Sequence, residues 1–192
     1  MNENVKLFFD EMAVNYVHDD SKLIEELLDS LRVTKCNRIL DLGCGKGIIS
    51  SKLAKRNHGE VVAIDLSSKM IELAKEKIKD PTVTFINADF YQFTDSDKFD
   101  AIVCFDAFPH FLYVEGYVNK AYELLKDDGL LAIIHDCGRN ELNSHHRAHA
   151  LKVSRMLDTP QKEFENFKEK FTPLELFENE KEYKMVMIKK ES

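Results

Sequence analysis

The sequence RILDLGCGKGIIS at residues 38–50 decides the fold of this chain. A short apolar run containing Asp41 leads into three glycines at alternate positions, Gly43, Gly45 and Gly47. Apolar residues with helical spacing follow, so the stretch is predicted to form a strand, a tight loop and a helix. That order opens a doubly wound α/β fold. Glycines suit such a loop because they tolerate positive φ and let the backbone approach a ligand closely.

The spacing of the glycines distinguishes two kinds of cofactor. A dinucleotide loop has the spacing Gly-x-Gly-x-x-Gly, with the pyrophosphate at the helix N-terminus. Here the spacing is Gly-x-Gly-x-Gly, and Asp41 precedes the first glycine by two residues. A carboxylate aimed into the loop would repel a pyrophosphate and attract a cationic ligand. The loop therefore favours a cationic cofactor over NAD, and an NAD-dependent oxidoreductase is the less favoured alternative.

At these residues the chain resembles the class I S-adenosylmethionine-dependent methyltransferases, whose first motif is an acid followed by x-Gly-x-Gly-x-Gly. Asp65 ends a predicted strand at 61–64 and is placed to accept hydrogen bonds from both hydroxyls of an adenosyl ribose. In the family, the acid after the third strand binds the adenine amino group and the next residue lies against the ring. Asp89 and Phe90 match these positions after a predicted strand at 83–86.

The resemblance implies a set of residues that bind S-adenosylmethionine. It comprises Tyr16, Asp41, Gly43, Cys44, Gly45, Gly47, Asp65, Leu66, Asp89, Phe90 and Phe105. Tyr16 has two interpretations, a place in a lid over the cofactor or packing in the core.

The remaining patterns predict one α/β domain over 1–192, with a helical lid at 1–32 and a Rossmann-like core at 38–192. The expected fold is a doubly wound, mostly parallel sheet of seven strands, with helices on both faces and a terminal antiparallel hairpin. Further strands are expected at 99–105, 130–134, 171–178 and 182–189, and helices at 3–16, 21–31, 48–56, 68–78, 114–126, 141–157 and 161–168. The 114–126 helix is expected to end at a C-cap formed by Asp128 and Gly129.

Composition limits the partners. The net charge is −7, and the first 31 residues hold eight acids against two lysines, which disfavours nucleic acid and polyanionic substrates. There is no apolar run of the roughly 20 residues that cross a bilayer and no secretory pattern, so we expect no membrane association and a cytoplasmic location. The four cysteines form no Cys-x-x-Cys pair and are expected to be small buried thiols. No pattern indicates an oligomeric state.

Histidines gather at one end of the predicted sheet. His110 and His135 follow the carboxyl ends of strands, where ligands bind in open α/β sheets. Helical spacing through 142, 146, 149, 153 and 156 predicts that His146 and His149 face the protein. Neutral imidazole acts as a general base or a metal ligand near pH 7. His110, His135 and His146 are therefore the candidate catalytic residues and the candidate ligands of a divalent metal ion; the alternative is that they shape the pocket.

These observations predict an S-adenosylmethionine-dependent methyltransferase. The segments Phe-Pro-His-Phe and Asn-x-x-His resemble a group of small stand-alone prokaryotic methyltransferases, which favours His110, His135 and His146 over His149. The acidic charge and the short chain favour a small-molecule acceptor. A protein that binds S-adenosylmethionine without turnover is the second alternative.

Overall fold

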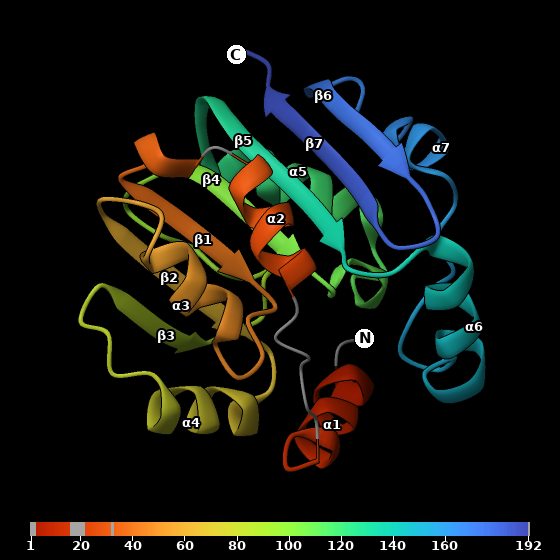
Figure 1. The fold of residues 1–192 in the computed structure, drawn as a ribbon, viewed down its shortest axis with the longest axis horizontal. Coiled ribbons are helices and arrows are strands. Elements are labelled where there is room, and N and C mark those ends of the chain that lie inside the picture. The colour runs from red at the N-terminus through yellow and green to blue at the C-terminus, as the bar shows by residue number, and fades with distance from the viewer. Residues whose placement is uncertain (1–2, 16–21, 32, 192) are drawn as a thin grey trace.

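A seven-stranded sheet forms the centre of the molecule in the computed structural model, which describes residues 3–15, 22–31 and 33–191. The strand order is β3-β2-β1-β4-β5-β7-β6 (Figure 1). The first five strands are parallel, and β7 runs antiparallel to both β5 and β6. This confirms the predicted sheet and its terminal hairpin. The strands are β1 (Arg38–Leu42), β2 (Glu60–Asp65), β3 (Val83–Asn87), β4 (Phe99–Phe105), β5 (Leu125–His135), β6 (Phe171–Glu178) and β7 (Tyr183–Lys189).

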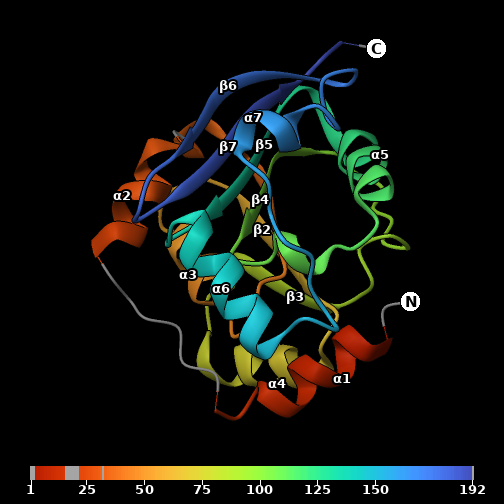
Figure 2. The same ribbon diagram turned by 90° about the vertical axis from the view of Figure 1, so that its right-hand side faces the viewer.

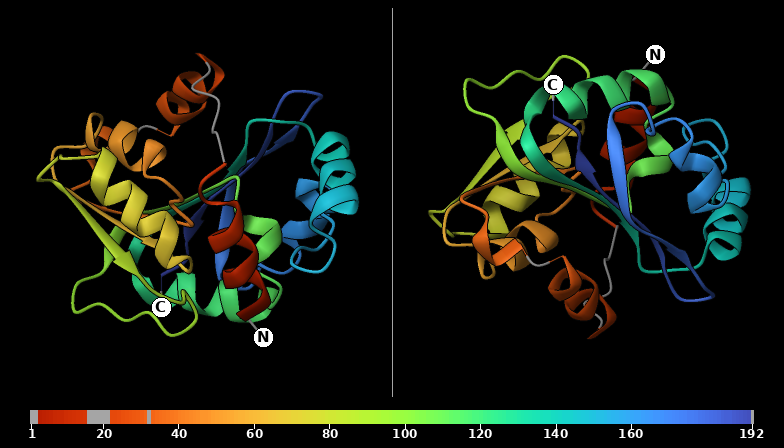
Figure 3. Two further views of the ribbon diagram at one scale, coloured as in Figure 1. Left: turned by 90° about the horizontal axis from the view of Figure 1, so that it is seen from below. Right: turned by 90° about the horizontal axis from the view of Figure 1, so that it is seen from above.

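Helices cover both faces of the sheet (Figure 3). On one face α2, α3 and α4 bury apolar side chains against the strands, and on the other face α5 packs over β4 and β5. The helices are α1 (Glu3–Met12), α2 (Lys22–Ser30), α3 (Ile48–Ala54), α4 (Ser68–Lys77), α5 (Val114–Leu124), α6 (Arg139–His149) and α7 (Pro160–Phe164), with 3-10 turns at Val33–Lys35 and Phe108–His110.

Strand β1 is the central strand of the parallel part. Its apolar side chains Ile39, Leu40 and Leu42 are at most 1% exposed, which fits a strand covered on both faces. The strand pairs with β2 on one side and β4 on the other, so the direction of winding reverses at β1. A crevice at the carboxyl end of β1 is the expected ligand site of such a sheet.

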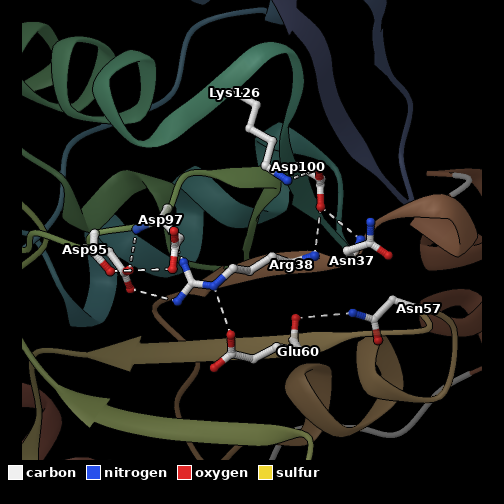
Figure 4. A network of polar contacts seen from close by, with 9 residues as sticks. Asn37, Arg38, Asn57, Glu60, Asp95, Asp97, Asp100 and Lys126 are labelled. Atoms are coloured by element: carbon white, nitrogen blue, oxygen red, sulfur yellow. Dashed lines mark hydrogen bonds and ion pairs between the residues drawn. The ribbon is translucent and has the colours of Figure 1, made fainter.

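Ion pairs join the opposite, amino end of the sheet. Arg38 at the start of β1 donates hydrogen bonds of 2.9 Å to Glu60 on β2 and to Asp95 in the loop before β4. Asp100 on β4 accepts hydrogen bonds from the backbone N–H groups of Asn37 and Arg38 (Figure 4). This network holds the starts of three neighbouring strands together, away from the crevice.

Several predicted boundaries are wrong. The 114–126 helix ends at Leu124, and β5 begins at Leu125 instead of 130. Asp128 takes φ +59° inside this strand, where the register with β4 shifts, so residues 128–129 form a bulge and not a C-cap. The 141–157 helix ends at His149, and α7 ends at Phe164 instead of residue 168.

The described residues contain no helix that is both long enough and apolar enough to cross a membrane.

Candidate functional site

A cavity opens at the carboxyl ends of β1, β2, β3 and β4. It holds about 1030 Å³ of empty space, part of it open to solvent. Nine residues predicted from the sequence line it, all at strand ends or in the segments that follow: Gly43, Cys44, Gly45, Asp65, Leu66, Asp89, Phe90, Phe105 and His110. Tyr16 lies outside the described residues.

The three loop glycines all have positive φ, but a side chain would meet different surroundings at each of them. A Cβ on Gly43 would lie 2.6 Å from the Cβ of Ala107, and one on Gly47 would lie 2.6 Å from the ring of Phe85. A Cβ on Gly45 would meet no atom within 4 Å. Gly43 and Gly47 therefore permit close packing, whereas Gly45 keeps space open beside the cavity.

Asp65 connects the end of β2 to the glycine loop. Its carboxylate accepts hydrogen bonds of 2.8 Å from the backbone N–H groups of Gly45 and Ser67. Burial raises the pKa of Asp65 to about 6, although these two hydrogen bonds favour the charged form. Ser67 also caps α4 by accepting a hydrogen bond from the N–H of Met70.

Asp41 does not point into the loop, which corrects the argument made from its position. It is 1% exposed, is absent from the cavity wall and accepts a hydrogen bond of 2.6 Å from the hydroxyl of Ser50. Burial raises its pKa to about 7, the Ser50 hydrogen bond opposes this, and the charge of Asp65 adds to it.

Aromatic side chains form one wall of the cavity. Phe90 is 3% exposed, and its ring packs against Phe111 with centroids 5.7 Å apart. Asp89 beside it accepts a hydrogen bond of 3.0 Å from the N–H of Tyr91. An acid next to a planar apolar surface suits a ring that carries an amino group.

Helix α1 covers part of the cavity. Val5 and Phe9 line it, and Asp10 accepts a hydrogen bond from the hydroxyl of Ser67 at the start of α4. Figure 2 shows α1 and α4 side by side. Helix α2 instead buries Ile24 and Leu28 against the sheet, so among the described residues of the predicted lid it is α1 that reaches the cavity.

His110 is the one predicted catalytic histidine that lines the cavity. Its Nδ1 lies 3.0 Å from the backbone carbonyl of Val153, and because a carbonyl only accepts, Nδ1 carries the proton and Nε2 has the lone pair. Burial lowers the pKa of His110 to about 4, so the ring is neutral at pH 7. Phe9 packs edge-on against it at 4.7 Å between centroids.

His135 and His146 lie behind the cavity wall. The ring of His146 packs edge-on against the ring of His110, with centroids 5.1 Å apart. Burial lowers the pKa of His146 to about 4. His149 is exposed, contrary to the predicted helical stripe, because α6 ends there.

No group of three or more His, Cys, Asp or Glu among the described residues is arranged to hold a metal ion, so the predicted metal site at His110, His135 and His146 has no structural support.

Asp106 also belongs to the site. It follows β4, lines the cavity and has φ +52°, which is unusual for a residue other than glycine. Its position directly after a buried strand is the same signal that identified Asp65.

Comparison with known proteins agrees with this geometry. Residues 39–129 match a family described as "Methyltransferase domain". The malonyl-[acyl-carrier protein] O-methyltransferase of Acetivibrio thermocellus is 32% identical over 134 residues, which are 67% of this chain and 47% of that protein. The rRNA adenine N-6-methyltransferase of Escherichia coli is 31% identical over 99 residues, 51% of this chain and 38% of that protein. The chain thus spans about half the length, or less, of these curated relatives.

Among solved structures, the N-methyltransferase NodS from Bradyrhizobium japonicum in complex with S-adenosyl-L-homocysteine superposes with a TM-score of 0.75. The match covers 98% of this chain and 100% of NodS at 16% identity, so it shows a shared fold. The fold, the glycine loop and the family match together place the chain among the class I S-adenosylmethionine-dependent methyltransferases. Within that class, the family match spans β1 to the bulge of β5 and contains most of the cavity wall.

Proposed function

We propose that the chain binds S-adenosylmethionine in the cavity and transfers its methyl group to a small-molecule acceptor. The observation that carries the proposal is the shared wall formed by Gly45, Asp65 and Asp89 at the ends of β1, β2 and β3. In this arrangement Asp65 accepts from the ribose hydroxyls, Asp89 accepts from the adenine amino group, and Phe90 lies against the ring. The buried charge of Asp41 favours the cationic end of the cofactor.

Methyl transfer needs little covalent chemistry from the protein. The sulfonium supplies the reactive methyl group, and the enzyme aligns the acceptor in line with the breaking bond while it excludes water. Helix α1 covers the cavity through Phe9 and supports such exclusion. His110 contributes a neutral Nε2 that can accept a hydrogen bond from the methyl acceptor. His135 lies against Asp106 and His146 lies against His110, so these two histidines support residues of the cavity wall.

The acceptor is proposed to be small because α1 covers part of the cavity and limits access to it. The acidic chain also argues against nucleic acid as a substrate, although one relative is named as an rRNA methyltransferase. All four cysteines are free thiols, which supports a reducing location such as the cytoplasm.

Calorimetric titration with S-adenosylmethionine, S-adenosylhomocysteine and NAD tests the cofactor. We expect micromolar or tighter binding of the first two and no heat with NAD. Binding of NAD alone would contradict the proposal and favour the oxidoreductase alternative.

Single-turnover assays with a labelled methyl donor and panels of thiols, amines and phenols then test transfer. Cofactor binding without transfer to any acceptor would indicate a binding protein.

A further inference from the structure

Asp106 lines the cavity in a strained backbone conformation. It follows the central strand β4, and its N–H donates a hydrogen bond of 2.9 Å to the carbonyl of Ile134 on β5. Its φ of +52° costs a side-chain-bearing residue on the order of 1 kcal/mol. Neighbouring structure therefore imposes this conformation, and such strain is concentrated at functional sites.

One oxygen of Asp106 is held and the other is available. Oδ1 accepts a hydrogen bond of 3.3 Å from the N–H of Asp136 and lies 3.2 Å from Nδ1 of His135. No described residue donates to Oδ2, and the side chain is 19% exposed. A carboxylate fixed through one oxygen in a cavity wall presents the other oxygen to a ligand with precision.

His135 is completely buried beneath Asp106. It is 0% exposed, and its ring packs edge-on against Tyr183 at 5.8 Å between centroids. Apart from the approach of Nδ1 to Asp106, neither ring nitrogen has a polar partner in the described part of the structure. Nδ1 of His135 approaches Oδ1 of Asp106 without forming a hydrogen bond, and a buried imidazole that makes no hydrogen bond needs a structural or functional explanation.

The chemistry of the wall selects the acceptor. Asp65 and Asp89 are assigned to the proposed cofactor, so Asp106 is the acid that remains for an acceptor among the described residues of the lining. The lining also contains Lys46 and several aromatic rings. Carboxylates and aromatic faces both stabilise an ammonium group and disfavour a carboxylate. Because His110 is neutral, it does not offset the acidic charge.

We propose that Asp106 binds the acceptor, that His135 is the positioning residue for Asp106, and that the acceptor is an amine. This inference rests on the proposed methyl transfer and specifies its substrate class. An amine that binds as an ammonium group first releases one proton to solvent. The lone pair of the neutral amine then forms a bond to the methyl carbon while the carbon–sulfur bond breaks and leaves its electron pair on sulfur. Positive charge moves from sulfur to nitrogen, where it pairs with Asp106, and the methylated ammonium product gives up its proton to water after release.

The experiment measures transfer from labelled S-adenosylmethionine to matched panels of primary amines and carboxylic acids. We expect transfer to amines alone. Asp106→Asn keeps the shape and tolerates positive φ, and it should lower kcat/KM for the amine on the order of 100-fold. S-adenosylhomocysteine affinity should stay unchanged. Asp97→Asn, an exposed change of the same kind outside the cavity, is the matched control and should leave both quantities unchanged.

A pair of His135 variants tests the positioning role. His135→Asn keeps a polar nitrogen near the place of Nδ1, whereas His135→Gln moves it away. We expect His135→Gln to raise KM for the amine about tenfold with unchanged cofactor affinity, and His135→Asn to restore most of the loss. Equal effects of the two variants would contradict positioning by His135.

Different failures separate this inference from the proposed function. Full amine transfer by Asp106→Asn, or transfer by the wild type to carboxylic acids or to no amine, would overturn the amine assignment while S-adenosylhomocysteine still binds. Absence of S-adenosylhomocysteine binding to the wild type would instead overturn the proposed function, and this inference with it.

Discussion

The carboxylate of Asp65 accepts a 2.8 Å hydrogen bond from the backbone N–H of Gly45, which ties the end of β2 to the loop after β1. The N–H of Ser67 donates to the other carboxylate oxygen. Two carboxylate oxygens can accept about four hydrogen bonds, so capacity remains for two hydroxyls of a ribose. The acid is therefore oriented before a ligand arrives, which reduces the ordering cost of binding.

Cofactor affinity should fall as the pH drops through about 6. The pKa of Asp65 is raised to about 6, and ribose hydroxyls hydrogen-bond best to the charged carboxylate. Below that pH the free protein holds a proton that binding must displace, so the affinity for S-adenosylhomocysteine should fall about tenfold per pH unit. Calorimetry between pH 5 and 7 measures this. Asp65→Asn should bind weakly and lose the pH dependence, and a flat wild-type profile would refute the role of Asp65.

Asp41→Asn should stabilise the protein at neutral pH. The folded-state pKa of Asp41 is raised from 3.8 to about 7, so between these values the folded state holds more protons than the unfolded state. Stability therefore decreases as the pH rises from about 4 to about 7. The asparagine removes this penalty while its amide oxygen can still accept from Ser50. Urea unfolding at pH 5 and pH 8 should show a larger gain for the variant at pH 8.

The same variant separates stability from binding. We expect Asp41→Asn to weaken binding of the sulfonium cofactor more than that of neutral-sulfur S-adenosylhomocysteine, because the lost charge lies near the cationic group in the proposed pose. Equal loss for both ligands would mean that Asp41 supports only the loop.

Local patterns predicted most of the fold. The β1 and β4 runs are apolar on both faces, and the alternation at 171–178 and 182–189 gave the terminal hairpin. Positions that depend on tertiary contacts were not predictable. Glycine next to an acid indicated a helix end at 128–129, but pairing of Leu125 with Phe99 extends β5 through a bulge instead.

Among the site residues, too, positions set by local sequence were predictable and side-chain directions set by tertiary contacts were not. Asp65 is the last residue of β2 and Asp89 lies two residues after β3, so both line the cavity at the carboxyl ends of parallel strands, a position that the sequence reveals. The direction of a side chain is set by its neighbours, so the burial of Asp41 against Ser50 was not visible. His146 and His149 share a predicted helical face, yet the helix ends at the second and leaves it exposed.

Alanine at two loop glycines should have different effects. Gly47→Ala places a Cβ 2.6 Å from the ring of Phe85 at φ +80°, so it should reduce the free energy of unfolding by about 2–4 kcal/mol. Gly45→Ala at φ +51° meets no atom, so it should cost only about 1 kcal/mol but fill space that the ligand needs. Thermal unfolding and S-adenosylhomocysteine affinity should rank the variants in opposite orders. The same ranking in both assays would contradict separate roles for the two glycines.

The Arg38 network should support stability without affecting the site. The Arg38 side chain is 17% exposed, donates to Glu60, Asp95 and the Asp97 carbonyl, and lies 4.4 Å from the centroid of the Phe99 ring. Arg38→Met keeps most of the apolar stem but leaves these acceptors without their donor, which should lower the free energy of unfolding by about 1–3 kcal/mol. Glu60→Gln is the matched control, because Glu60 is 43% exposed and its loss should cost less than about 1 kcal/mol.

Both variants should bind S-adenosylhomocysteine like the wild type, since the network holds the amino ends of the strands and the cavity lies at their carboxyl ends. Weakened binding in folded Arg38→Met would show that the two ends of the sheet are coupled.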